Sequence, residues 1–126
     1  MTPHELHHLF MDEIDICGCG NPEDSVELVR KILNLAPLHT DRHWEKAQEL
    51  IGSSGAFHII LSVLTNADLM EHGGGIGGSW LTGKGEAARD ALNLLAESDP
   101  QFEPIVGCEW YEHIPDECEI CHPKTP

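Results

Sequence analysis

Basic residues are scarce in this sequence. Its 126 residues include 7 Lys and Arg against 22 Asp and Glu, so the formal net charge is −15 with histidine neutral. Non-specific binding to nucleic acid and docking on an anionic membrane both need a cationic surface. The composition therefore argues against both classes of partner. The length fits one domain, residues 1–126, and the apolar fraction of 40% is above that of a disordered chain.

Long apolar runs are also missing. The longest, about Phe57–Leu64, is far shorter than the roughly 20 residues of a transmembrane helix. The first ten residues, MTPHELHHLF, lack the cationic start and the apolar segment of a secretory signal. We therefore expect a cytoplasmic protein without membrane association. In that compartment, closely paired cysteines favour metal binding over disulfides.

The negative charge and the cysteines occupy the same two parts of the chain. Residues 1–29 hold 7 acids and no Lys or Arg, and residues 90–126 hold 9 acids and one base. Residues 30–89 hold 6 acids and 6 bases, so they are neutral. All five cysteines lie in the two acidic ends. This distribution predicts a neutral core flanked by two acidic, cysteine-bearing segments.

Four of the cysteines form two close pairs about a hundred residues apart. One pair lies in the sequence CGCG and the other in CEIC. Tetrahedral Zn²⁺ takes four N or S ligands, and short-spaced thiolate pairs from two segments supply them. We therefore predict a structural Zn²⁺ site, with Cys108 or His122 as an alternative for one ligand. The predicted ligands are Cys17, Cys19, Cys118 and Cys121.

Helix start and stop signals predict a mainly α protein. Thr2 and Glu5 match a capping box with Pro3 at the first helical position, and Ser53 or Ser54 caps a later helix. Trp44 is expected to face inward. The expected helices cover about residues 3–16, 22–36, 41–51, 55–70 and 85–97. Residues 1–40 thus form an N-terminal helical extension.

A glycine-rich stretch interrupts the helices. Residues 73–85, GGGIGGSWLTGKG, hold 7 of the 12 glycines and predict a β-hairpin, with a short strand over residues 79–82. Residues 100–126 hold five of the eight prolines, so residues 98–126 are predicted to form an irregular tail. The zinc ion would clip this tail to the loop around residues 17–20.

Residues 41–97 contain two short motifs, Asp68-Leu69-Met70-Glu71 and LTGKG at residues 81–85. With these motifs residues 41–97 resemble the C-terminal half of winged-helix proteins. The first motif corresponds to the end of the helix before the wing, and the second resembles the step from the wing into the last helix. The stretches CGCGNPE and GGSWLTGKG are also similar to small uncharacterised bacterial and phage proteins. The resemblance implies a winged-helix-like core. DNA-binding members carry basic or amide side chains on the helix before the wing, whereas Phe57–Met70 contains no Lys or Arg.

Three other motifs offer alternative functions. His4-Glu5-x-x-His8 matches the zinc motif of metallohydrolases, with Glu5 as general base. The segment CEICH at residues 118–122 matches a c-type haem attachment site, although haem is attached after export. The glycines of residues 73–83 match dinucleotide and phosphate-loop patterns only in part.

These observations predict a non-enzymatic, zinc-binding interaction or regulatory module. Its acidic ends would face a protein partner with a basic surface. A winged-helix DNA-binding regulator is the first alternative, and a metal-dependent hydrolase using His4, Glu5 and His8 is the second.

Overall fold

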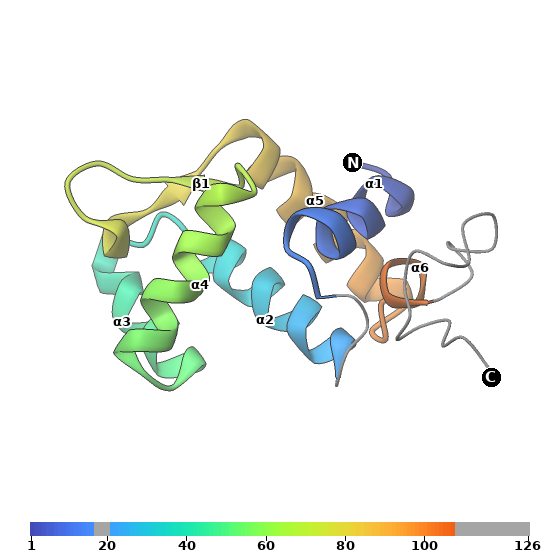
Figure 1. Ribbon diagram of the computed structural model, residues 1–126, viewed down its shortest axis with the longest axis horizontal. Coiled ribbons are helices and arrows are strands. Elements are labelled where there is room, and N and C mark those ends of the chain that lie inside the picture. Colours follow the sequence, from blue (N-terminus) through green and yellow to red (C-terminus); the bar gives the residue numbers. More distant parts are fainter. Residues whose placement is uncertain (17–20, 108–126) are drawn as a thin grey trace, which may run out of the picture.

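Over the residues that the structure describes, the protein is mainly helical with one small antiparallel sheet, as the sequence predicts. The computed structural model describes residues 1–16 and 21–107. Figure 1 shows α1 and α6 at one end of the molecule and α3 with the glycine-rich hairpin at the other. The elements are α1 (Pro3–His8), η1 (Leu9–Glu13), α2 (Pro22–Leu35), η2 (Thr40–Arg42), α3 (His43–Ile51), α4 (Ser54–Asn66), β1 (Met70–Glu71), η3 (Ile76–Gly78), β2 (Trp80–Leu81), α5 (Gly83–Ser98) and α6 (Glu103–Val106).

A continuous apolar core joins these elements. The long helix α2 packs against α3, α5 and α6, and α1 packs against α5 and α6. Every helix except η2 and η3 contributes a buried apolar side chain. The largest fully buried side chains are Phe10, Phe57, Phe102, Leu6, Leu9, Ile32, Leu33, Leu38, Leu61, Leu64, Leu69 and Met70.

Two of the predicted helix starts are confirmed in detail. The Thr2 side chain accepts a hydrogen bond from the Glu5 N–H at 3.1 Å, and the Glu5 carboxylate accepts one from the Thr2 N–H at 2.9 Å. The Ser53 hydroxyl accepts the Ala56 N–H at 3.1 Å and caps α4. These short-range bonds involve residues three positions apart, which is why the sequence pattern finds them.

The first helix widens after its second turn. The sequence predicts one helix that ends before Cys17, but α1 gives way to the π-helical turn η1, in which the Ile14 N–H bonds the Leu9 carbonyl at 2.9 Å. The wider turn leaves three consecutive residues in the core: Leu9, Phe10 and Met11 are at most 5% exposed. Burial of three adjacent side chains exceeds what one face of a regular α-helix provides.

The helix before the hairpin is shorter than predicted. It ends at Asn66 rather than near Met70, and Asp68 adopts a left-handed conformation with φ of 61°. This turn lets Met70 pair with Leu81 in the two-stranded sheet. Met70 is 1% exposed, so burial of its side chain favours the strand over another turn of helix.

Two further expectations differ from the structure. Trp44 is 36% exposed rather than inward, and the Arg42 guanidinium lies 5.6 Å from the centre of its ring. The stretch expected to be irregular from residue 98 instead contains α6, with Phe102 and Ile105 fully buried. The few apolar residues among the prolines show no helical periodicity, so the sequence pattern does not predict this helix, and burial of Phe102 and Ile105 in the core stabilises it.

Candidate functional site

The predicted zinc ligands all lie outside the described residues. Cys17 and Cys19 belong to residues 17–20, and Cys108, Cys118 and Cys121 belong to residues 108–126. Within residues 1–16 and 21–107, no group of three or more His, Cys, Asp or Glu side chains is placed to hold a metal ion. The zinc site therefore stays a prediction.

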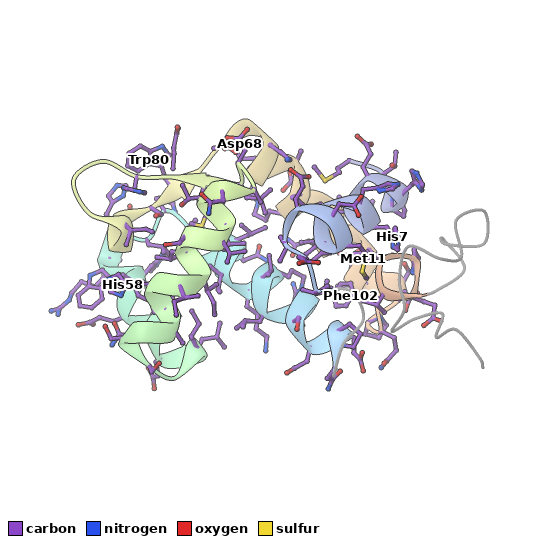
Figure 2. The ribbon with its side chains drawn as sticks, viewed as in Figure 1. His7, Met11, His58, Asp68, Trp80 and Phe102 are labelled. Carbon is purple, nitrogen blue, oxygen red and sulfur yellow. The ribbon has the colours of Figure 1, made fainter. Side chains whose placement is uncertain are left out.

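The described elements that border the two cysteine-bearing segments pack against each other. Helix α1 and the turn η1 lead to residue 16, α2 begins after residue 20, and α6 leads to residue 107. Helix α6 contacts both α1 and α2. Figure 2 shows His7, Met11 and Phe102 at this end of the molecule, with His58 and Trp80 at the opposite end.

A buried histidine joins α1 to α6. His7 is 1% exposed, and its Nδ1 donates a hydrogen bond to the Ile105 carbonyl at 2.5 Å. Burial lowers the pKa of His7 below its ordinary value of 6.5, although the Ile105 carbonyl opposes the shift by accepting the Nδ1 proton. The neighbouring His8 lowers it further. His7 is therefore a neutral structural group in this contact.

The lowered pKa of His7 predicts that acid weakens the fold. The unfolded chain takes up the histidine proton near pH 6.5, whereas the folded chain takes it up only at lower pH. The free energy of unfolding should therefore fall as pH drops below about 6.5, by at most about 1.4 kcal/mol per pH unit for one group. Urea unfolding of the wild type and of His7→Asn between pH 5 and 7.5 checks this. His7→Asn should reduce the slope with pH, while His58→Asn, at an exposed histidine, should retain it; equal slopes in all three proteins would contradict the assignment.

In the motif His4-Glu5-x-x-His8, the two histidine rings contact each other and the glutamate forms part of the helix cap. The two Nε2 atoms lie 3.1 Å apart, and His8 Nδ1 donates to the Asp12 carboxylate at 2.7 Å. The Glu5 carboxylate caps the Thr2 N–H, and this bond lowers its pKa. Glu5 therefore has a structural partner, and the hydrolase alternative gains no support from this arrangement.

The LTGKG stretch forms a structural junction between α4 and α5. The Thr82 hydroxyl donates to the Asp68 carbonyl at 2.6 Å and accepts the Gly85 N–H at 3.0 Å, so it caps α5. A Cβ atom on Gly85 would lie 2.0 Å from the Leu69 carbonyl oxygen. Only glycine fits where the two backbones approach so closely.

Lys84 is part of the same junction. Its Nζ donates to the Glu13 carboxylate at 2.6 Å and to the Ala67 carbonyl at 3.0 Å. The ammonium thus lies at the C-terminal end of α4, where exposed carbonyls favour a cation. Because it is held by η1 and α4, Lys84 has a structural role that the wing resemblance did not indicate.

The described Lys and Arg side chains give little support to a nucleic-acid interface. Among the described residues, four Lys and Arg side chains contact carboxylates, in the pairs Arg30–Glu27, Arg42–Glu45, Lys84–Glu13 and Arg89–Asp90. Helix α4 has no charged residue. Its exposed side chains are Ser54, His58, Ile59, Ser62 and Asn66.

The glycine run does not have the geometry of a phosphate loop. Residues 73–78 connect β1 to β2 and include the single turn η3. A dinucleotide or phosphate loop instead joins a strand directly to the start of a helix. The haem motif at residues 118–122 lies outside the described residues.

An apolar groove lies between η1, α2 and α4. Its volume is about 250 Å³, and Ser25 is its one polar lining residue. Two exposed acidic residues are adjacent in sequence to residues that line the groove: Asp15 lies between two lining isoleucines, and Asp24 precedes Ser25. The lining residues are Ile14, Ile16, Ser25, Leu28, Val29, Ile60, Val63 and Leu64.

The groove continues into a more polar hollow along α2. Leu28 borders both, and the second hollow includes Asp24, Glu27 and Lys31. This groove was not predicted from the sequence. The available indication was that Ile59 and Val63 lie outside the inward stripe of α4, which makes the apolar face of that helix wider than the stripe alone.

Among the described residues, no single helix is long and apolar enough to span a membrane. Thr40–Ile51 and Ser54–Asn66 meet the length and composition criteria only when taken together, across a bend of 107°.

Comparison with known proteins gives no relative. Protein-family models, curated proteins and solved structures were searched, and none matches the chain. The function must therefore be inferred from the site itself.

Proposed function

We propose that this chain is an acidic protein-interaction module that binds a basic amphipathic helix in the groove between η1, α2 and α4. The groove is the observation that carries the proposal. An exposed concave surface lined almost wholly by apolar side chains is typical of helix-in-groove recognition. No catalytic group is needed for this function.

The choice of partner rests on charge. Asp15 and Asp24 are exposed beside the groove, and the chain carries a net charge of −15. Apolar anchors on one face of the bound helix would fill the groove, and its Lys and Arg side chains would meet the surrounding carboxylates. Long-range attraction would also speed association with a cationic partner.

We further propose that residues 41–97 form a winged-helix-like core and that structural zinc joins residues 17–20 to the tail. The order α3, α4, hairpin, α5 supports the first proposal. The packing of α6 against α1 and α2 supports the second, because these elements border both cysteine-bearing segments. Cytoplasmic localisation and a bacterial or phage origin remain predictions from the sequence.

A designed peptide tests the binding function. The probe is a fluorescent 16-residue helix with leucines on one face and lysines on the other, and its control replaces every lysine by glutamate. We expect the lysine peptide to bind and Val63→Asp to weaken binding at least about tenfold, because a carboxylate would be placed among apolar groups. Fluorescence anisotropy at low and physiological salt measures both.

A charge-matched variant provides the control. Leu94→Asp adds the same charge at a side chain that is 70% exposed on α5 and outside the groove, so it should bind like the wild type. Equal weakening by both variants, or equal binding of the glutamate peptide, would contradict the proposal. A duplex DNA that bound at low salt would instead favour the DNA-binding regulator.

A further inference from the structure

We infer that His4 and His8 form a solvent-facing binding site for a late divalent transition metal ion such as Ni²⁺, Cu²⁺ or Zn²⁺. This site is distinct from the predicted cysteine site and does not depend on the proposed partner binding. It is also distinct from a hydrolase centre, since Glu5 caps the first helix. The chain supplies two ligands, and water completes the coordination.

The geometry of the pair suits metal binding. His4 and His8 are four residues apart, which places their side chains on the same face of α1. Their Nε2 atoms are 3.1 Å apart, and the ring planes meet at 81°. With metal–nitrogen bonds of about 2.0–2.1 Å, this separation corresponds to a ligand–metal–ligand angle of about 95–102°. That angle lies between octahedral and tetrahedral values, so little rearrangement is needed.

Asp12 fixes the orientation of one ligand. Its carboxylate accepts the His8 Nδ1 proton at 2.7 Å, so in the neutral ring the His8 Nε2 carries a lone pair. A carboxylate on the second ring nitrogen is the usual support of a metal-bound histidine. Asp12 is therefore a positioning residue rather than a ligand.

The metal replaces a proton between the two rings. In the neutral His8 ring Nε2 is the acceptor, so the 3.1 Å contact is then an N–H···N bond in which His4 Nε2 donates. For binding, that proton leaves His4 Nε2, and both nitrogens then direct lone pairs at the ion. The His8 and Asp12 side chains are 47% and 59% exposed, so a hydrated ion has access.

Imidazole chemistry determines the class of ion. Neutral imidazole nitrogen suits Zn²⁺, Cu²⁺ and Ni²⁺, whereas Mg²⁺ and Ca²⁺ require oxygen ligands. The Irving–Williams order places Cu²⁺ above Ni²⁺ at such a site. We therefore expect Mg²⁺ at the same concentration to leave the pair unoccupied.

Paramagnetic broadening of amide signals locates the ion. The full-length protein as purified is titrated with Ni²⁺, and ¹H–¹⁵N spectra are recorded. We expect saturable broadening centred on residues 3–12, lost in His8→Asn. His58→Asn, which removes an exposed histidine from α4, should leave the broadening unchanged. Broadening that survives His8→Asn, or that centres elsewhere than residues 3–12, would overturn the inference.

A second variant tests the role of Asp12. Asp12→Asn retains both nitrogen ligands but replaces the carboxylate that holds His8, so nickel affinity should fall about tenfold while the broadened residues stay the same. Circular dichroism of each metal-free variant shows whether α1 is still folded. An unchanged affinity in a folded Asp12→Asn protein would contradict the positioning role.

Discussion

Replacing Gly85 by alanine should destabilise the protein by about 3 kcal/mol or more, lowering the melting temperature by about 10 °C. A Cβ atom at this position would lie 2.0 Å from the Leu69 carbonyl oxygen and 3.0 Å from its carbon. These are backbone atoms between α4 and β1, so relief requires α5 to move away from the hairpin. Thermal unfolding followed by circular dichroism measures the change.

The sign of the effect makes this prediction specific. Alanine is normally more favourable than glycine inside a helix by up to about 1 kcal/mol. Gly83→Ala, two residues earlier in α5, is the matched control, because no atom lies within 4 Å of its added Cβ. It should be neutral or slightly stabilising. Equal stability of the Gly85 and Gly83 variants would show that α5 does not approach Leu69 so closely in solution.

Removing zinc should produce a loss of similar size. If the purified protein holds one zinc ion per chain at the four predicted cysteines, chelation should lower the free energy of unfolding by about 4 kcal/mol relative to free zinc at a thousandfold its dissociation constant. The physical reason is that the folded chain binds the ion and the unfolded chain does not. Elemental analysis and chelator-dependent melting give both quantities.

Cysteine variants distinguish the predicted ligands from the remaining thiol. Cys17→Ser and Cys118→Ser should each lose zinc and stability. Cys108→Ser should retain both if the four predicted ligands are correct, and should lose zinc if Cys108 replaces one of them. Intact zinc content in the first two variants would contradict the zinc site altogether. Iron with the visible spectrum of haem would instead favour the CEICH motif.

Local patterns predicted most of the helical structure. The Thr2–Glu5 capping box and the Ser53 cap act between residues three positions apart, so the sequence alone reveals them. The glycine-rich stretch after α4 likewise identifies the hairpin. In the two caps the hydrogen-bonding groups are three positions apart, and in the hairpin the local signal is the glycine-rich turn.

The remaining features depend on contacts between distant residues. The strand at Met70 requires pairing with Leu81, and the buried Phe102 is held by packing against the core. The role of Lys84 depends on Glu13, 71 residues away. Single-sequence patterns contain no information about such separations.

The candidate sites also depend on geometry that the sequence alone does not reveal. The histidine spacing at His4 and His8 is visible in the sequence, but whether the rings face each other depends on their side-chain conformations. The groove could not be identified because its lining residues Ile16 and Val63 are far apart in the sequence and come together only in the folded protein. Neither residue belongs to a recognisable motif.

The contact between α1 and α6 brings together two segments that are far apart in the sequence. His7 and Ile105 are 98 residues apart in sequence, yet they share a hydrogen bond. Bringing the ends of such a long loop together costs conformational entropy, and each doubling of the loop adds only about 0.6 kcal/mol. In the folded protein the packing of α6 against α1 already compensates for this loss of entropy. In the folded protein a cross-link between the cysteine-bearing segments would therefore not have to close this long loop again, whereas in the unfolded chain it would have to close a loop of about a hundred residues.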